Sequence, residues 1–469
     1  MNIKKSILKV FSANFLQLIS GIIIGFVVPA VLSIEGYANL KTYMLYVSYI
    51  GLFHFGFIDG LYIKYGGKKI DEISKNELKG EHTFLIIFQI VISLLLFLLG
   101  LCRNDIVIIL FSISILPIMI QAFHKYIYQA TGNFSKYSNI IYIYTIFYTI
   151  LNVILAFVFH SQNYILYCLT TFVANLFSTI MFEIKFIINY KDVKVKINKD
   201  DIKNTIKIGF IVLLGNLAVV SLFGIDKWFV KLFLTTEDFA YYSFAVSMLN
   251  IINTLVNAIS VTFYNYLFTN NSNENIEKLK NYLITLGGFA SLGYFVLAFI
   301  VKYFIEKYIP SLNIIAITFA VFPYMILINA LYVNLYKVNK NEKKYFKVVI
   351  SMLLISILYN IIAIVVFKNT MSIAFATILT LITWVIYSTY DLKNVKTTKK
   401  MYIYMFLLTT FFLICTQCFN WLIGGIIYFV IFIILTWLLN KNVIKECYEM
   451  LSKSIKKLKN NRKKEKIEN

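Results

Sequence analysis

Long apolar stretches alternate with short polar segments along the whole chain. They fall at roughly 7–31, 40–63, 83–101, 106–130, 139–159, 163–188, 207–234, 239–267, 282–305, 312–336, 346–367, 371–390, 401–419 and 421–440. A helix needs about 20 apolar residues to cross a bilayer. The period-2 alternation of a membrane barrel is not seen, and a helix satisfies its own backbone hydrogen bonds in lipid. The pattern therefore predicts an all-α integral membrane protein with about fourteen transmembrane helices.

Composition narrows the function classes. Of the 469 residues, 59% are hydrophobic and 14% are charged, which excludes a soluble globular chain. The spans leave no room for a large soluble catalytic domain. The outer loops are short, which disfavours a membrane-embedded sugar polymerase, and the phosphate-binding pattern GxxxxGK[ST] does not occur. We expect no enzyme, no catalytic residues, no cofactor and no metal site.

The net charge of +22 is a topology signal rather than a sign of nucleic-acid binding. Most Lys and Arg residues fall in alternate polar segments, and such residues stay on the cytoplasmic side. The exceptions are Lys41, Arg103, Lys227, Lys231, Lys302, Lys307 and Lys368. This bias supports the number of spans and predicts a multi-pass membrane protein with both termini in the cytoplasm.

Two segments of the chain resemble each other. At an offset of 202 residues, Asn14 and Glu35 correspond to Asn216 and Glu237. At an offset of 208 residues, a second set of residues recurs after the fourth and tenth spans: Tyr128, Asn133, Lys136 and Tyr137 match Tyr336, Asn341, Lys344 and Tyr345. Six spans per repeat give both repeats the same orientation, as in parallel-repeat transporters.

The repeat predicts two pseudo-symmetric six-helix bundles around a central cavity, plus two C-terminal helices. The expected boundaries are 1–188 for the first bundle, 189–206 for a cytoplasmic linker, 207–390 for the second bundle, 391–440 for helices 13 and 14, and 441–469 for a Lys-rich cytoplasmic tail.

Polar residues within spans are expensive, so they are candidates for function. Candidates for substrate binding are Asn14, Gln17, Lys125, Asn216, Lys227, Asn250, Asn253, Asn257 and Tyr264. Asn250, Asn253, Asn257 and Tyr264 share one helical face, which suits sugar hydroxyls or, equally, helix packing. The lysines either attract a lipid diphosphate or extend to the headgroups. Candidates for ion coupling are His54, Asp59 and Asp226.

Three segments resemble the polysaccharide and O-antigen flippases of the multidrug, oligosaccharidyl-lipid and polysaccharide (MOP) exporter superfamily. They are residues 56–66, residues 128–137, and residues 225–228 running on to 237–245. The resemblance implies two six-helix bundles with a V-shaped central cavity. It also implies transfer of a lipid-linked oligosaccharide from the inner to the outer leaflet of a bacterial plasma (inner) membrane.

The leading hypothesis is therefore a flippase for an undecaprenyl-diphosphate-linked oligosaccharide, an O-antigen or capsular repeat unit, that works by alternating access. Its expected partners are this substrate, membrane lipids and a polysaccharide polymerase with its export machinery, and no nucleic acid. The alternatives are a flippase for the peptidoglycan lipid precursor, a multidrug antiporter of the same fold, and the less favoured sugar polymerase. The peptidoglycan group resembles sites rich in Arg, whereas this chain has two arginines, Arg103 and Arg462.

Overall fold

The computed structural model describes residues 3–269, 272–392 and 398–445, apart from the side chains of 3–7, 255–266, 268 and 269. The chain is 88% helical, and the described residues form no strand. Eleven helices are long and apolar enough to cross a membrane, and the number rises to 13 when two bent pairs each count as one span. That count covers the described residues. The helix α10 (Thr236–Thr269) lies outside it and coincides with the expected span at 239–267. The all-α membrane class is confirmed.

Polar residues in the loops set where several helices begin. Asp105 accepts hydrogen bonds from the backbone N–H groups of Val107 and Ile108 at the start of α5. Asn163, Asn198 and Asn420 cap three further helices in the same way. Each side chain satisfies backbone donors that have no partner within the helix.

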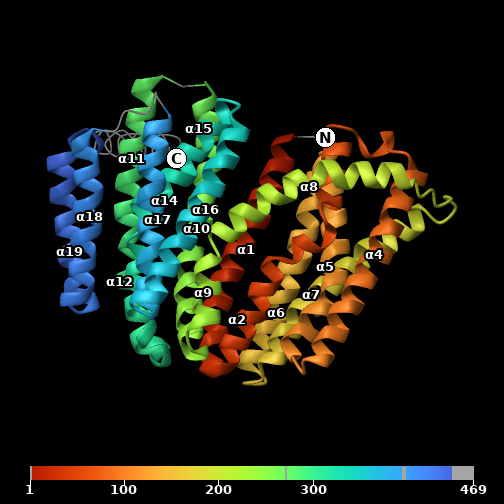
Figure 1. Ribbon diagram of the computed structural model, residues 1–469, viewed down its shortest axis with the longest axis horizontal. Coiled ribbons are helices and arrows are strands. Elements are labelled where there is room, and N and C mark those ends of the chain that lie inside the picture. The colour runs from red at the N-terminus through yellow and green to blue at the C-terminus, as the bar shows by residue number, and fades with distance from the viewer. Residues whose placement is uncertain (1–2, 270–271, 393–397, 446–469) are drawn as a thin grey trace, which may run out of the picture. The chain divides into compact units, whose positions relative to one another are not determined.

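The chain forms two compact units that meet in sequence at Phe244 and Ala245, within α10. The predicted borders at 188 and 207 describe repeats of sequence rather than clusters of contacts, and they stay a prediction. The helices of the first unit (Figure 1) are α1 (Ile3–Val31), α2 (Ile34–Ser48), η1 (Ile50–His54), α3 (Phe57–Tyr65), η2 (Ile70–Glu72), α4 (Lys75–Cys102), α5 (Ile106–Ala130), α6 (Phe134–Phe157), α7 (Tyr164–Asn189), α8 (Lys199–Leu222) and α9 (Ile225–Phe233).

The first unit is built around α5, which packs against α2, α3, α4, α6 and α7. The helix α1 packs against α6, and polar side chains join these two helices. Ser20 hydrogen-bonds to Thr149 at 2.5 Å, and the Lys9 ammonium donates to Ser135 at 2.8 Å. Such hydrogen bonds join helices in lipid, where apolar burial gives little driving force for association.

Glycines allow α3 and α8 to touch through their backbones. A Cβ on Gly209 would overlap with the carbonyl oxygen of Gly56 and the backbone nitrogen of Gly60. A Cβ on Gly60 would overlap with the carbonyl of Thr205. The small residues therefore bring the start of the seventh predicted span onto the second, within the first unit.

The second unit continues from α10 with α11 (Asn273–Ser291), α12 (Gly293–Phe304), η3 (Glu306–Ser311), α13 (Leu312–Phe319), α14 (Phe322–Leu327), η4 (Ile328–Tyr332), α15 (Val333–Val338), α16 (Glu342–Val366), α17 (Thr370–Asp391), α18 (Lys399–Cys418) and α19 (Trp421–Leu439). All of α14 is buried, and it packs against α11, α17 and α18. The pair α18 and α19 packs on α11 and α12, where the Tyr428 hydroxyl donates to the Gly288 carbonyl at 3.0 Å. The predicted tail lies, from residue 446 on, outside the described residues.

The turns after α5 and α15 repeat the same hydrogen bonds at the offset of 208 residues. Asn133 N–H donates to the Tyr128 carbonyl, and Asn341 N–H donates to the Tyr336 carbonyl, at 2.7 and 2.9 Å. Gly132 and Lys340 take equivalent left-handed conformations, with φ of 68° and 54°. Both turns therefore end a helix with the same left-handed capping motif.

Candidate functional site

The second predicted span is broken close to its middle. Its parts α2 with η1, and α3, meet at an angle of 61°, because Phe55 and Gly56 both have positive φ, 50° and 85°. The break frees backbone groups, and the buried Gln89 amide donates to the Phe53 carbonyl at 3.0 Å. Broken helices with satisfied backbone groups are a common way to build binding sites in transporters.

Three of the predicted residues come together beside this break. His54 Nδ1 accepts from the Gly56 N–H at 3.0 Å, and His54 Nε2 lies 3.8 Å from Asp59 Oδ2. Asn216 on α8 donates to Asp59 Oδ1 at 3.3 Å. The imidazole and carboxylate are both buried. Chemically, such a pair can exchange a proton.

The seventh predicted span is also divided, into α8 and α9, at Phe223 and Gly224. At the start of α9, Asp226 accepts from the Tyr242 hydroxyl and from the Lys227 backbone N–H, both at 2.8 Å. The Asp226 carboxylate also attracts the Lys227 ammonium, although among the described residues no carboxylate lies within ion-pair distance of that ammonium.

Aromatic rings and lysines from α2 and α9 form one surface, which we call the lysine–aromatic face. Trp228 lies between Tyr46 and Tyr49, with ring centroids 5.9 and 5.8 Å apart. The Lys231 ammonium donates to Thr42 at 2.9 Å and lies 6.0 Å from the Tyr46 ring. The face comprises Lys41, Thr42, Tyr46, Tyr49, Lys227, Trp228 and Lys231. Its rings were not predicted, because most aromatic residues in a membrane protein only pack.

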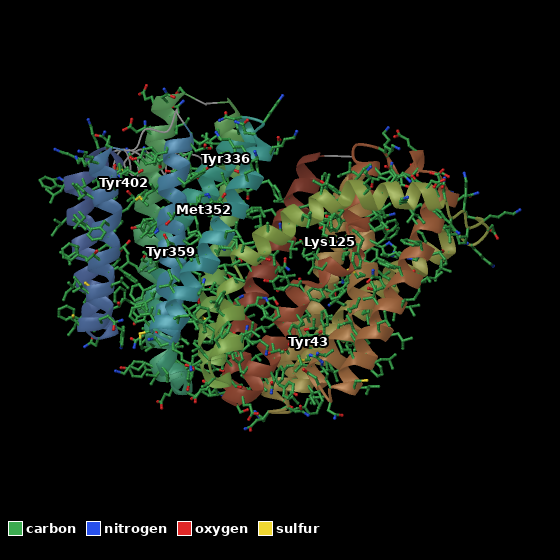
Figure 2. The ribbon with its side chains drawn as sticks, in the orientation of Figure 1. Tyr43, Lys125, Tyr336, Met352, Tyr359 and Tyr402 are labelled. Atoms are coloured by element: carbon green, nitrogen blue, oxygen red, sulfur yellow. The ribbon has the colours of Figure 1, made fainter. Side chains whose placement is uncertain are left out.

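Lys125 lies on α5 in the first unit (Figure 2), and its ammonium is 5.8 Å from the Tyr137 ring. In the described part of the chain, no carboxylate pairs with it. By contrast, Lys64 is bound by Glu81 at 2.7 Å and by Asp201 at 2.5 Å. Lys64 is therefore paired with two carboxylates, whereas Lys125 has no carboxylate partner among the described residues.

The remaining predicted residues are spread over both units. Asn14 and Gln17 are exposed on α1, on the side away from the contacts with α6. In the second unit Asn250 is exposed, and Asn253 accepts from the Asn329 amide at 3.5 Å. The side chains of Asn257 and Tyr264 lie outside the described residues. The asparagine stripe of the sequence is thus described only in its first half.

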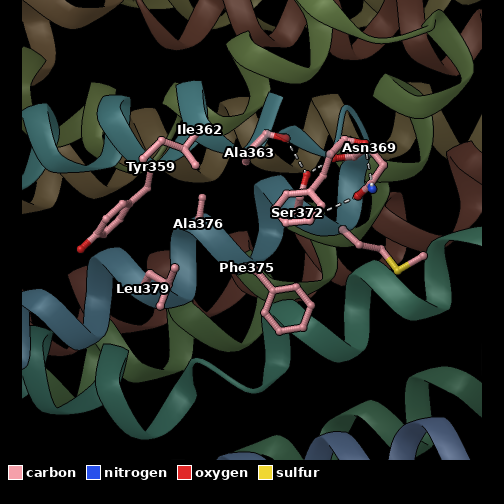
Figure 3. A pocket seen from close by; sticks show the side chains of 10 residues that line it. Tyr359, Ile362, Ala363, Asn369, Ser372, Phe375, Ala376 and Leu379 are labelled. Atoms are coloured by element: carbon pink, nitrogen blue, oxygen red, sulfur yellow. Dashed lines mark hydrogen bonds between the residues drawn. The ribbon is translucent and has the colours of Figure 1, made fainter. Parts of the chain in front are cut away.

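An apolar groove runs between α16 and α17 of the second unit (Figure 3). Its volume is about 400 Å³, and it is lined mainly by carbon, including Tyr359, Phe367, Phe375 and Leu379. Asn369 caps α17 at one end of it by accepting from the Ser372 N–H at 2.8 Å. Its lining suits an alkyl chain better than a polar headgroup.

Sequence reasoning missed a second group of titratable residues. His82, His124 and Glu183 come from α4, α5 and α7 and converge in the first unit. Their positions are far apart in sequence, so spacing gave no signal. A weak signal existed, since Glu183 and the two histidines are polar residues within or beside apolar stretches.

No protein-family profile and no curated protein matches this sequence. Solved structures do. The inward closed conformation of the lipid II flippase MurJ matches with a TM-score of 0.67 and 16% identity, over 94% of this chain and 99% of that one. An outward-facing MATE multidrug resistance transporter of the MOP superfamily matches with a TM-score of 0.53 and 10% identity, over 87% and 97%. An inward-facing one matches with a TM-score of 0.54 and 12% identity, over 82% and 96%.

These similarities define the class of fold. The chain is a multi-pass, all-α membrane protein with the fold of MOP-superfamily transporters. The similar structures are a lipid flippase and drug transporters. The narrower resemblance to polysaccharide and O-antigen flippases, read from the sequence, stays a prediction.

Proposed function

We propose that this chain is a flippase that moves an undecaprenyl-diphosphate-linked oligosaccharide across a bacterial plasma membrane by alternating access. The observation that carries the proposal is the lysine–aromatic face, which lies beside two broken spans. It combines cations with flat rings, the two chemistries that a diphosphate joined to sugars requires. The likeness in fold to a lipid II flippase supports the same class of substrate.

The cations of the face suit a diphosphate. Lys227 and Lys231 lie one helical turn apart on α9, and Lys41 comes from α2 close enough for its charge and that of Lys227 to repel. Asp226 and Asp105 attract Lys227 and Lys231, but placing several ammonium groups close together in a membrane protein is still unfavourable. The negative charge of a bound diphosphate would offset this repulsion, which favours binding of the headgroup at this face.

The rings suit the sugars. Trp228 already contacts both Tyr46 and Tyr49, so ring contacts hold its side chain in place without a substrate. A preorganised surface loses little side-chain entropy on binding. Lys125, on α5, would contact the diphosphate from the inner side, and Asn14, Gln17, Asn216, Asn250 and Asn253 would donate to sugar hydroxyls.

The coupling of transport to an ion is assigned, within this proposal, to His54 and Asp59. The pair is buried, and Asn216 connects it to α8, the first part of the divided span. A proton that binds there changes the charge at a junction of α3 and α8. Asp226, which is bound by Tyr242, would stabilise α9 rather than carry the ion.

The two alternative functions are a drug transporter and a flippase for the peptidoglycan precursor. The match to MurJ has a higher TM-score than the MATE matches, 0.67 against 0.53 and 0.54, which favours a lipid-linked substrate over a drug. It leaves the peptidoglycan precursor as the second candidate substrate. Rescue of growth in cells depleted of their peptidoglycan-precursor flippase would support that candidate and contradict the oligosaccharide.

The test measures surface polysaccharide in cells that carry variants at equal protein level. Lys125→Ala and Lys227→Ala should lower export by about tenfold or more, the loss expected for a charged contact worth over 1.4 kcal/mol. Lys227→Arg should retain most export, because a diphosphate needs a positive charge there. The matched control is Lys302→Ala, an exposed lysine of α12. Normal export by both alanine variants would show that these lysines only reach the headgroups.

A further inference from the structure

We propose that His82, His124 and Glu183 form a binding site for a divalent transition-metal ion of the Zn²⁺ class in the first unit. The two imidazoles present Nε2 to the same carboxylate oxygen. His82 Nε2 lies 2.8 Å and His124 Nε2 lies 2.6 Å from Glu183 Oε1. One ligand atom from each residue lies within 4.8 Å of the other two.

The distances between the ligand atoms are close to those around a bound metal ion. A tetrahedral Zn²⁺ ion with ligands at 2.0–2.2 Å separates its ligand atoms by about 3.4 Å. The carboxylate must therefore move outward by less than about 1 Å from the two nitrogens to admit the ion. Two imidazoles and one carboxylate are a set that Zn²⁺ accepts, with a water molecule as the fourth ligand.

Charge also favours a cation in this position. His82 and His124 are 5% and 3% exposed, and the Glu183 side chain is 16% exposed. Among the described residues, the Glu183 carboxylate pairs with these two imidazoles and with no Lys or Arg, and a charge that is removed from water is costly without a counter-charge. The charged group nearest in sequence, Lys185, is exposed on α7 and lies over the Phe182 ring. A divalent ion at the triad would supply such a counter-charge.

The surroundings hold the ligands in place and leave a way in. The Phe186 ring packs against both imidazoles, with centroids 4.4 Å from His82 and 5.6 Å from His124. Phe123 packs against both from another side. His124 lines a cleft of about 580 Å³ together with Tyr128, which gives an ion and its fourth, water ligand access. This cleft is also lined by Asp71 and by three lysines, Lys75, Lys136 and Lys185. The lysines would repel an entering metal ion, so its binding would depend on coordination by the three ligands.

A metal here would add a link between three helices that already pack together around these side chains. The helices α4 and α7 each pack on α5, and the ligands come from one position on each of the three. The site lies at the end of the unit that we predict to be cytoplasmic. Its role is therefore to fix this end of the first unit, separately from the lysine–aromatic face.

The experiment measures metal content in the full-length protein, purified in detergent without a histidine tag or chelator. Mass spectrometry of the elements should find about one zinc ion per chain. His82→Gln, His124→Gln and Glu183→Gln should each lower that content by about tenfold or more. His160→Gln is the matched control, because His160 is an exposed loop residue, and it should keep its zinc. Equal zinc in all variants would place the metal elsewhere and overturn the proposal.

A second measurement needs no variant. After chelation, added Zn²⁺ should raise the melting temperature of the wild-type protein by a few degrees, and Co²⁺ should give the visible absorption of a tetrahedral site. Wild-type protein that retains no zinc and shows neither response would mean that the triad is only a hydrogen-bonded cluster. This result would leave the proposed transport function unaffected, since the two rest on different residues.

Discussion

Single glycines determine how closely α3 and α8 approach. Gly56, Gly60 and Gly209 have no side chain between the two backbones, and each added Cβ would meet backbone atoms that cannot rotate away. Gly209→Ala should therefore lower stability by about 1–3 kcal/mol, the usual cost of overpacking. The measurement is the melting temperature of the detergent-solubilised protein, followed by loss of the monodisperse peak.

The control for this prediction is Gly21→Ala. A Cβ on Gly21 meets nothing within 4 Å, and alanine favours a helix over glycine by about 1 kcal/mol. Gly21→Ala should thus be neutral or stabilising. If Gly209→Ala were equally harmless, the two helices would not be in backbone contact.

The two matching turns have different residues at the left-handed position, and this difference predicts opposite effects of substitution. Gly132 occupies the left-handed position without strain, whereas Lys340 takes the same conformation with a Cβ. Lys340→Gly should raise stability by about 1 kcal/mol, and Gly132→Lys should lower it by a similar amount. Melting temperatures of both variants test this, and a loss of stability in Lys340→Gly would show that the lysine side chain makes a contact worth more than the strain.

Among the elements, α9 depends on a hydrogen bond from the start of α10. The buried Tyr242 hydroxyl donates to the buried Asp226 carboxylate at 2.8 Å. A hydrogen bond to a charged group contributes about 1.5–3 kcal/mol, so Tyr242→Phe should destabilise the protein by that amount. Thermal unfolding in detergent at fixed pH is the measurement.

The neighbouring tyrosine provides the control. Tyr241 makes the same kind of hydrogen bond, to Glu237 at 2.7 Å, but in an exposed place. Water replaces a lost partner there, and Tyr241→Phe should change stability by about 0.5 kcal/mol or less. Similar effects of the two substitutions would contradict the structural role given to Asp226.

The positions of the elements were largely predictable, and their breaks were not. The predicted span at 106–130 coincides with α5 (Ile106–Ala130), because hydropathy measures what lipid requires. Hydropathy does not report φ. The predicted single spans at 40–63 and 207–234 are therefore each divided, at Phe55 and Gly56 and at Phe223 and Gly224.

The same limit applies to the candidate sites. His54 and Asp59 are near in sequence, but one continuous helix would place residues five apart on different faces. The break at Phe55 and Gly56, which hydropathy does not report, brings them together. His82 and Glu183 lie on different helices, and one sequence has no information about which helices pack together. The sequence identified lysines of the lysine–aromatic face as candidates, because cations within a membrane are rare. It did not identify the rings, because aromatic residues are common in membrane proteins.

For the whole molecule, the charge pattern predicts an orientation in the membrane that can be measured directly. Reporter fusions after Lys75, Lys199, Lys340, Lys396 and Lys457 should be active in the cytoplasm. Fusions after Glu35, Glu237 and Asn369 should be active outside, where the basic residues are few. Using one reporter active on each side of the membrane gives every position its own control, and a reproducible inversion at one position would exclude the fourteen-helix topology.

The order of synthesis determines when the contact between α3 and α8 can form. The ribosome completes α3 well before α8, and α4 to α7 are inserted between them. Until residues 199–222 follow, the glycine face of α3 has no partner helix. A gene divided at the boundary of the two repeats would therefore separate α3 from the helix that covers it, and the first six spans alone would be an unfinished product rather than a half-transporter.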